Sequence, residues 1–387
     1  MRINDEHARG RTYSSRTAVA QALSMNCRLL YLVGQLSPGG LERQLCYLLQ
    51  AMDRERYRPA VAVWNFAEAD VYVPRIRALN VPLYAFPNMP SAAKLRAFRR
   101  LVRQLVPEVV HSYTFFTNFA AYWGVWGTSS MAFGSIRSDF TREMKISSPW
   151  LGRLSARWPR DQICNSSLAA ETVRRWQSPF VPRRLIVVRN GLDLEQFRSA
   201  PLTARGKIRI VGVGSLEPVK RWDRLLIAAR ELQRQGYDFV VQIAGDGSLH
   251  RSLQHQAEVL GVADHVEFMG YSENIPGIMA NATFLVHTSD NEGYPNVVME
   301  AMACGRAVVA TDAGDVPSLV EDGKTGFVVP RGDEATLLAR MVTLMADHDL
   351  CRRMGEAGRV KAEQQFGLDR LVSETLAAYR AMGWQDA

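Results

Sequence analysis

Two carboxylates stand close together in the segment NEGYPNVVMEAMACG, residues 291–305, which is otherwise almost entirely apolar after Pro295. Glu300 has three apolar residues directly before it and three directly after it. A carboxylate in a buried helix costs several kcal/mol unless hydrogen-bond donors bind it. We therefore expect one of two situations. Either this helix face is exposed to solvent, or Glu300 binds a partner that the sequence does not contain.

The segment has the end signals of a short helix. Proline is favoured at the first helical position and glycine just past the last one, so Pro295 and Gly305 predict a helix from about residue 295 to 304. Its first turn would present free N–H groups and the positive end of the helix dipole, which together bind phosphate.

A ligand for this helix can be inferred from the position of Glu300. The carboxylate would lie about 7.5 Å along the axis from the first turn at Asn296 and Val297. A carboxylate accepts hydrogen bonds at both oxygens, which suits the vicinal hydroxyls of a ribose. Phosphate at the tip and ribose one turn deeper is the layout of a bound nucleotide. The alternative is an exposed glutamate on an ordinary helix.

A second segment, VGVGSLEPVKRWDRLL, places two cations just after a predicted strand. Lys220 and Arg221 could neutralise a diphosphate there, although a solvated surface pair is the alternative. Gly212 and Gly214 are followed by Glu217 where a dinucleotide fingerprint needs a third glycine. This departure disfavours an NAD-dependent dehydrogenase.

Apolar runs rich in β-branched residues alternate with helical patterns along most of the chain. Such alternation indicates βαβ units and parallel sheets covered on both faces. The runs form two series, so we predict an α/β protein with two Rossmann-like, doubly wound parallel-sheet domains that face each other across a cleft. The runs cover residues 27–34, 58–64, 108–113, 131–136, 161–167 and 185–191, then 207–215, 239–247, 265–270, 282–289, 306–312 and 325–330.

The domain boundaries follow from these series and from a polar join near EQFRSAPLTARGK. Ligands of such folds bind beyond the carboxyl ends of the strands, so the interdomain cleft is the expected site. We predict a flexible extension, an N-terminal Rossmann-like domain, a linker, a C-terminal Rossmann-like domain and a final helix that could cross back to the first domain. Their ranges are 1–26, 27–198, 199–206, 207–366 and 367–387.

Composition narrows the class of protein. The chain has 387 residues, 47% of them hydrophobic and 22% charged, as in an ordinary globular protein. Its five scattered cysteines include no C-x-x-C pair, which argues against a disulfide framework and a zinc site. No apolar run of about 18 residues and no secretory signal are evident, so a cytoplasmic protein is expected.

Charge is unevenly distributed. Residues 1–200 carry 28 lysines and arginines against 14 acidic residues, whereas the remainder carries 19 against 25. A basic N-terminal half suits an anionic substrate or an anionic membrane face. No nucleic-acid-binding motif accompanies the charge, so no nucleic-acid partner is expected.

The motifs together resemble the family-four (group one) glycosyltransferases of GT-B fold. The pattern is E-x7-E, formed by Glu292 and Glu300. It is supported by GSLEPVKR, AGDG, VEFMG and RNGLD, and by SPGGLERQL at residues 37–45. The similarity runs from about residue 27 through nearly the whole chain.

The resemblance implies an acceptor-binding domain at residues 27–198, a nucleotide-sugar-binding domain at residues 207–366, and a role for each matched residue. Glu300 would bind the donor ribose, Glu292 the hydroxyls of the transferred sugar, and Lys220 the leaving diphosphate. Such enzymes need no metal or other cofactor, and the donor is a cosubstrate. The remaining donor-site residues would be Gly39, Gly40 and Gly214, the amides of Asn296 and Val297, and Met269, Gly270 and Tyr271 near the base.

The chain departs from the family pattern at two places. Ser215 stands where the family often has arginine, so Arg221 is our candidate for the missing cation. Where the family often has H-x-H, the chain has His111 followed by Tyr113. We keep His111 as a candidate catalytic residue, with a structural histidine as the alternative. Arg137 follows the next strand and could face the cleft.

The resemblance implies a retaining transfer of a sugar from a nucleoside diphosphate to a hydroxyl acceptor. The basic amphipathic helix predicted at residues 94–105 suits contact with an anionic membrane face. A lipid-linked saccharide or glycan in polysaccharide biosynthesis is therefore the expected acceptor. The alternatives are a nucleotide-sugar epimerase, a phosphorylase with a pyridoxal cofactor, and a non-catalytic nucleotide-sugar-binding or scaffold protein.

Overall fold

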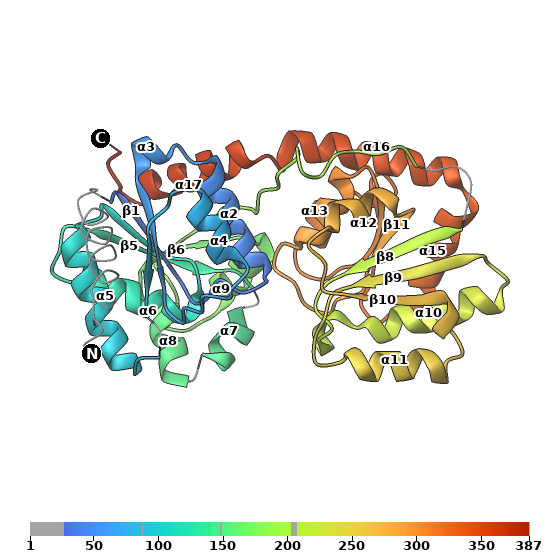
Figure 1. Ribbon diagram of the computed structural model, residues 1–387, viewed down its shortest axis with the longest axis horizontal. Coiled ribbons are helices and arrows are strands. Elements are labelled where there is room, and N and C mark those ends of the chain that lie inside the picture. The colour runs from blue at the N-terminus through green and yellow to red at the C-terminus, as the bar shows by residue number, and fades with distance from the viewer. Residues whose placement is uncertain (1–26, 87, 139, 148, 203–206, 387) are drawn as a thin grey trace, which may run out of the picture.

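The computed structural model describes residues 27–86, 88–138, 140–147, 149–202 and 207–386. The predicted extension at 1–26 and residues 203–206 of the predicted linker lie outside this range. The described chain forms two α/β domains side by side, the N-terminal domain in blue to green and the C-terminal domain in yellow to orange (Figure 1). The predicted fold class, two parallel-sheet α/β domains, is confirmed.

The N-terminal domain is built on a seven-stranded parallel sheet in the order β3-β2-β1-β4-β5-β6-β7. Six of the strands coincide with predicted runs. The seventh, β3, was missed because it is a three-residue edge strand without a continuous buried apolar run. The strands are β1 (Leu29–Val33), β2 (Pro59–Val63), β3 (Leu83–Ala85), β4 (Val109–Ser112), β5 (Met131–Ile136), β6 (Asp161–Cys164) and β7 (Arg184–Val187).

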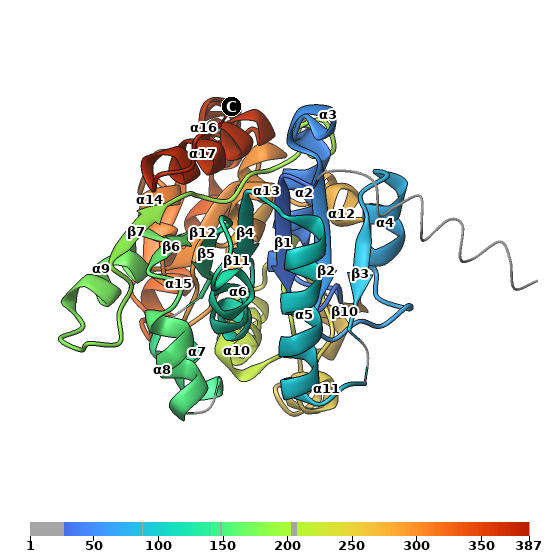
Figure 2. The same ribbon diagram turned by 90° about the vertical axis from the view of Figure 1, so that its left-hand side faces the viewer.

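Helices cover both faces of this sheet, and Figure 2 looks onto the domain with α5, α6 and α8 toward the viewer. The helices are α2 (Gly40–Ala51), α3 (Arg54–Tyr57), α4 (Tyr72–Ala78), α5 (Ser91–Leu105), α6 (Asn118–Val125), α7 (Phe140–Ile146), α8 (Pro149–Arg157) and α9 (Ser167–Arg175), with a 3-10 turn at Phe115–Thr117.

The C-terminal domain has a six-stranded parallel sheet in the order β10-β9-β8-β11-β12-β13. All six strands fall on predicted runs. They are β8 (Ile208–Val213), β9 (Phe239–Ala244), β10 (Val266–Gly270), β11 (Phe284–His287), β12 (Ala307–Thr311) and β13 (Gly326–Val329).

The helices of this domain are α10 (Trp222–Arg234), α11 (His250–Val259), α12 (Ile275–Asn281), α13 (Asn296–Ala303), α14 (Val316–Leu319), α15 (Glu334–Ala346) and α16 (His348–Gln365). Two 3-10 turns, Pro218–Lys220 and Ala263–His265, complete it.

Hydrophobic patterning explains why both sheets are buried on both faces. Every residue of β1, β2 and β12 is buried, which is the pattern of a parallel strand packed between two helix layers. The carboxyl ends of the strands in both sheets point toward the interdomain space (Figure 1). The loops that follow those ends therefore supply the residues that can reach a ligand.

The chain ends on the N-terminal domain. Helix α16 packs on the C-terminal domain against α13, and α17 (Leu368–Ala381) crosses back to pack against α2. Both helices run along one edge of the molecule in Figures 1 and 2. The hydroxyl of Tyr379 on α17 lies 2.6 Å from the Nδ1 atom of His111. The last helix therefore reaches the core beneath β4.

A carboxylate of the C-terminal domain also joins the two domains. Asp315, which is buried, accepts hydrogen bonds from the backbone N–H groups of Ser167 (2.7 Å) and Leu168 (3.0 Å) and from the hydroxyl of Ser166 (2.8 Å). These groups form the start of α9 in the N-terminal domain. A negative charge at a helix N-terminus is stabilising, so Asp315 holds the domains together at one side of the cleft.

Candidate functional site

A cavity of about 720 Å³ opens between the two domains. Its walls come from the segments that follow β1, β2, β5, β6 and β7 on one side and β8, β9, β10 and β11 on the other. Of the residues predicted for the site, the cavity is lined by Gly39, Gly40, Gly214, Lys220, Tyr271, Glu292, Asn296, Val297 and Glu300. The strand-end loops thus bring together residues that are far apart in the sequence.

Helix α13 forms as its end signals predict. It runs from Asn296 to Ala303, directly after Pro295, and Gly305 follows with a φ of +70° that favours glycine. No side chain caps its N-terminus, so the first backbone N–H groups remain available at the cavity wall. Glu300 is buried, with an exposed fraction of 1%.

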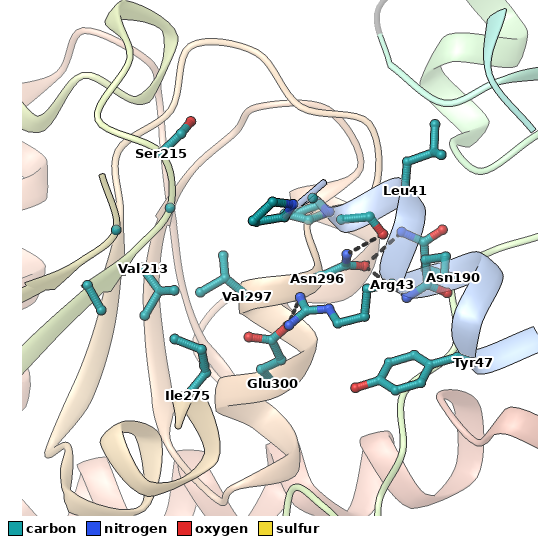
Figure 3. Close-up of a pocket in the computed structure, with 18 of the residues that line it drawn as sticks. Leu41, Arg43, Tyr47, Asn190, Val213, Ser215, Ile275, Asn296, Val297 and Glu300 are labelled. Atoms are coloured by element: carbon teal, nitrogen blue, oxygen red, sulfur yellow. Dashed lines mark hydrogen bonds and ion pairs between the residues drawn. The ribbon is translucent and has the colours of Figure 1, made fainter. Parts of the chain in front are cut away.

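The partner of Glu300 is Arg43, on α2 of the N-terminal domain. The Arg43 guanidinium forms an ion pair with the Glu300 carboxylate across the cleft, drawn as a dashed line in Figure 3. The expectation that a buried Glu300 needs a partner from outside the sequence was wrong. Burial raises the pKa of Glu300, and the positive charge of Arg43 offsets part of that effect.

The amide side chain of Asn296 is also held by the opposite domain. Its Oδ1 atom accepts hydrogen bonds from Asn190 (2.8 Å) and Gln44 (3.3 Å), and its Nδ2 atom donates to the carbonyl of Gly40 (3.4 Å). These bonds fix the start of α13 against the start of α2 (Figure 3). The starts of α2 and α13 therefore meet at the cavity.

Lys220 and Glu292 form a partly buried ion pair at the cavity wall, with 19% and 14% of their side chains exposed. The Lys220 Nζ atom lies 2.6 Å from Oε1 of Glu292, and the same oxygen lies 3.1 Å from Nε2 of His287. Burial alone would raise the pKa of Glu292, but Lys220 and His287 outweigh it and hold that pKa well below its ordinary value. Glu292 is therefore ionised at neutral pH.

The position of Lys220 is set by its own backbone. It ends the 3-10 turn at Pro218–Lys220, and its carbonyl accepts a hydrogen bond of 2.8 Å from the hydroxyl of Thr288. Gly214 lies against the lysine stem, because a Cβ atom on that glycine would stand 3.3 Å from Lys220 Cε. Ser215 also lines the cavity, at the place where the family often has arginine.

Arg221 does not supply a cation to the cavity. Its guanidinium pairs with Asp223 (2.8 Å) and Asp290 (3.0 Å), and the side chain is not part of the cavity wall. The backbone at Arg221 has a φ of +53°, and its side chain is 32% exposed. The predicted role of Arg221 as the missing diphosphate cation is therefore corrected.

His111 lies in the core, outside the cavity wall. Its Nδ1 atom contacts the Tyr379 hydroxyl, and its Nε2 atom lies 2.9 Å from the hydroxyl of Ser135. Burial lowers the pKa of His111 well below its usual value, with Arg137 adding to the effect. The ring is therefore neutral and fully engaged in structure, and the predicted catalytic role is corrected to a structural one.

Two residues predicted to lie near the base of the nucleotide are also outside the cavity wall. Met269 is 41% exposed, and the carbonyl of Gly270 accepts a 2.8 Å hydrogen bond from the N–H of Gly245. Only Tyr271 of the three predicted residues lines the cavity. Tyr271 is the first residue after β10, at the start of the loop that reaches the cavity, whereas Met269 and Gly270 belong to the strand itself.

Sequence reasoning missed several residues that line the cavity. Arg43 was part of the quoted segment SPGGLERQL, but nothing in a single sequence pairs it with Glu300. Asn165 and Asn190 are polar residues near the ends of the predicted runs 161–167 and 185–191, which is the signal that could have found them. Arg137 was noted as a residue that could face the cleft, and it lines the cavity.

Within the described ranges, no group of three or more histidine, cysteine, aspartate or glutamate side chains could hold a metal ion. Asp347 and Asp349 belong to the junction of α15 and α16, where Asp347 Oδ1 accepts a 2.8 Å bond from the N–H of Leu350.

All five cysteines are free and buried. Of the helices described, none is long and apolar enough to cross a bilayer.

Two family profiles match the chain in succession. The profile described as Glycosyltransferase Family 4 matches residues 38–196, and that described as Glycosyl transferases group 1 matches residues 193–361. The first match covers the strands of the N-terminal sheet from β2 to β7, and the second covers the C-terminal sheet with most of α16. The cavity thus lies between the two matched regions.

Several curated proteins are similar to the chain. A putative colanic acid biosynthesis glycosyltransferase of Salmonella typhimurium, WcaL, is 32% identical over 207 residues, which are 51% of this chain and 51% of that protein. The N-acetyl-alpha-D-glucosaminyl L-malate synthase of Bacillus anthracis is 25% identical over 187 residues, 48% and 49% of the two chains. The chain spans about half the length of the curated relatives it matches.

Solved structures share the fold over nearly the whole described chain. HepE of Anabaena, in complex with UDP and glucose, has a TM-score of 0.80 at 20% identity and covers 92% of this chain and 100% of its own. Sucrose-phosphate synthase of Thermosynechococcus elongatus has a TM-score of 0.77 at 17% identity, with 92% and 99% covered. At these identities the likeness establishes the two-domain fold.

Proposed function

Because the chain belongs to the group 1 glycosyltransferases of GT-B fold, we propose that it transfers a sugar from a nucleoside diphosphate donor to a hydroxyl acceptor with retention of configuration. One observation carries the proposal. A single interdomain cavity collects a cation, an uncapped helix N-terminus and a buried carboxylate in the order that a nucleotide sugar requires. These are Lys220, the start of α13 and Glu300.

The chemistry follows from the charges of the reaction. Departure of the diphosphate leaves negative charge on a phosphate oxygen and positive charge at the sugar carbon. Lys220 has three N–H donors and uses one on Glu292, so the others can bind that oxygen. The N–H groups of Asn296 and Val297 add the positive helix end. Preorganised charges of this kind commonly lower the barrier of a reaction more than any other single effect.

Glu292 and Glu300 bind hydroxyl groups of the donor. Glu292 uses Oε1 for Lys220 and His287, which leaves Oε2 for a hydroxyl of the transferred sugar. Glu300 binds the ribose hydroxyls in place of Arg43. In this proposal no metal ion takes part, since Lys220 and the helix end carry the charge on the diphosphate. Turnover that is unchanged by EDTA would support this, and turnover lost in EDTA and restored by magnesium would reject it.

We place the acceptor on the N-terminal domain and infer a lipid-linked saccharide or a glycan in polysaccharide biosynthesis. The name of WcaL, a relative assigned to colanic acid biosynthesis, supports this class. The exposed face of α5 carries Arg96, Arg100 and Arg103, which suits peripheral contact with an anionic inner membrane face. Lys94 does not belong to that face, because it is buried and donates 2.7 Å bonds to Trp64 O and Asn65 Oδ1.

Two experiments test the proposal. In a thermal-shift screen with UDP, GDP, ADP and their sugars, one base should raise the melting temperature, and Glu300→Gln should reduce that shift. With the matching nucleotide sugar and a glycan acceptor, the anomeric proton of the product should show the donor configuration by NMR. Conversion of the nucleotide sugar without an acceptor would indicate an epimerase, and binding without any turnover would indicate a non-catalytic protein.

Membrane contact has its own test. Vesicles with anionic lipid should carry the protein upward in a flotation assay at low salt. Replacing Arg96, Arg100 and Arg103 by glutamine should leave the protein in the soluble fraction while preserving its nucleotide-dependent thermal shift. Wild-type protein that stays in the soluble fraction rejects the contact.

A further inference from the structure

Four cationic side chains line the interdomain cavity, and three of them face a carboxylate of the C-terminal domain. Lys220 pairs with Glu292, Arg43 with Glu300, and Arg75 with Glu273 at 3.3 Å. The fourth is Arg137. Among the residues that the structure describes, it has no carboxylate partner, and its Nε and Nη1 atoms are buried without any hydrogen-bond acceptor.

The contacts of Arg137 do not compensate this charge. Its guanidinium carbon lies 4.1 Å from the centre of the Tyr113 ring. A cation–π contact of this kind stabilises a cation only modestly. Arg137 is half-buried, and its two buried N–H groups without an acceptor together cost more free energy than such a contact supplies. The ring therefore orients the guanidinium but leaves a deficit that an anion would remove.

A second polar atom beside Arg137 is also without a partner. Asn165 is 5% exposed, lines the cavity, and has no hydrogen bond to its Oδ1 atom within the described chain. Parallel register explains why the two residues are neighbours. Ile136 at the end of β5 pairs with Cys164 at the end of β6, so Arg137 and Asn165 leave the sheet side by side.

This pair lies next to the predicted sugar-binding carboxylate. A Cβ atom on Gly293 would stand 2.9 Å from the carbonyl oxygen of Arg137 and 3.2 Å from Oδ1 of Asn165. Gly293 directly follows Glu292. The unpaired cation therefore belongs to the reacting end of the cavity, across from the helix end that would hold the diphosphate.

Resting on the function proposed above, we propose that Arg137 and Asn165 form a subsite for an anionic group of the substrate, a carboxylate or a phosphate, at the sugar end of the cavity. Arg137 supplies the charge and a two-pronged donor that suits either anion. Asn165 accepts a hydrogen bond from a neighbouring hydroxyl. The anion can belong to the transferred sugar, as in a uronic acid, or to the acceptor.

The test uses the full chain and has two arms. Both arms use the nucleoside diphosphate that raises the melting temperature of the protein most among UDP, GDP and ADP. In the donor arm, calorimetry compares its glucose and glucuronate derivatives. In the acceptor arm, protein saturated with the nucleoside diphosphate is titrated with glucose, glucuronate and glucose 1-phosphate.

We expect the anionic probe to bind at least tenfold more tightly than its neutral counterpart in at least one arm, and the responding arm identifies the source of the anion. Arg137→Met should abolish this preference, and Arg137→Lys should retain part of it. Both should keep the affinity for the nucleoside diphosphate within about twofold. Equal binding of charged and neutral probes by the wild type overturns the subsite, as does a preference that survives in Arg137→Met.

Asn165→Asp gives an independent check that keeps Arg137 in place. The new carboxylate would supply Arg137 with an internal partner, so the preference for anionic probes should fall by at least tenfold while the melting temperature stays near that of the wild type. Failure of every nucleoside diphosphate to bind the wild type would instead contradict the proposed function itself. The two failures are therefore distinguishable.

Discussion

Arg43 on α2 and Glu300 on α13 form an ion pair that bridges the two domains across the cavity (Figure 3). The side chain of Arg43 is 22% exposed and that of Glu300 is 1% exposed. The carboxylate proposed to bind a ribose is thus already occupied by a donor from the opposite domain. A bound nucleotide would have to replace that guanidinium, so donor binding and the contact between the domains are energetically linked.

Removing Arg43 should increase the thermal stabilisation that the protein gains from binding its donor nucleotide. Arg43→Met leaves Glu300 buried without its partner, which typically costs about 3–5 kcal/mol. The ribose hydroxyls would then supply the missing donors, so the nucleoside diphosphate should raise the melting temperature more in the variant than in the wild type. Differential scanning fluorimetry measures both shifts. Equal shifts would show that Arg43 and the nucleotide do not compete for Glu300.

Replacing both Lys220 and Glu292 should restore stability that is lost when Lys220 alone is replaced, but it should not restore activity. Lys220→Met should lower the free energy of unfolding by about 3–5 kcal/mol, because it leaves Glu292 buried with only His287 as a partner. The double variant with Glu292→Gln should recover most of that loss in urea denaturation. Turnover should stay about 30- to 1,000-fold below wild type in both, as for a lost charge stabiliser. Wild-type turnover in either variant contradicts the assignment.

Arg221 offers a contrast with its neighbour. Arg221→Ala removes partly exposed ion pairs, and Asp290 keeps Arg224 at 2.7 Å as a partner. We expect a stability loss of about 1 kcal/mol or less. Nucleoside diphosphate affinity by calorimetry and turnover should both remain within about threefold of wild type. A tenfold loss of affinity would restore the diphosphate role that the structure argues against.

The carboxyl group of Glu42 should make the free energy of unfolding depend on pH. It is 9% exposed, and burial raises its pKa to about 7, with a smaller contribution from Asp70. The native state therefore binds more protons than the unfolded chain between about pH 4.5 and 7. Stability should fall as the pH rises through this window, by up to about 3 kcal/mol.

The urea midpoint at pH 5 and pH 7.5 measures this fall. Glu42→Gln should remove most of it, whereas Glu55→Gln, on the exposed surface of α3, should leave it unchanged. An identical pH dependence in wild type and Glu42→Gln would place the titrating group elsewhere.

His111 should matter for stability and not for chemistry. His111→Phe leaves the hydroxyls of Tyr379 and Ser135 without their partner, at a cost of about 1–3 kcal/mol for each buried group. Tyr379→Phe breaks one of the same bonds from the other side and is the matched control. Both variants should melt at lower temperature and keep kcat/KM within about threefold, measured well below melting. A loss of activity confined to His111→Phe would indicate a catalytic histidine.

Local patterning was sufficient to predict much of this protein. Apolar runs bounded by glycine and polar turns predicted all six strands of the C-terminal sheet, and Pro295 and Gly305 predicted the limits of α13. These features depend on neighbours within a few residues, where the spacing of side chains fixes what can be buried. The short edge strand β3 escaped because an edge strand of three residues needs no continuous apolar run.

The sequence alone placed a lone acid in an apolar helix, but only the tertiary structure decided what that acid touches. Arg43 is 257 positions away from Glu300 and is brought to it where α2 and α13 meet across the cavity. Packing also gives two adjacent residues different environments, because Lys220 faces the cavity and Arg221 pairs with Asp223 and Asp290. Charge partners are selected by packing in three dimensions, where burial makes an unpaired ion costly, and no local pattern encodes that choice.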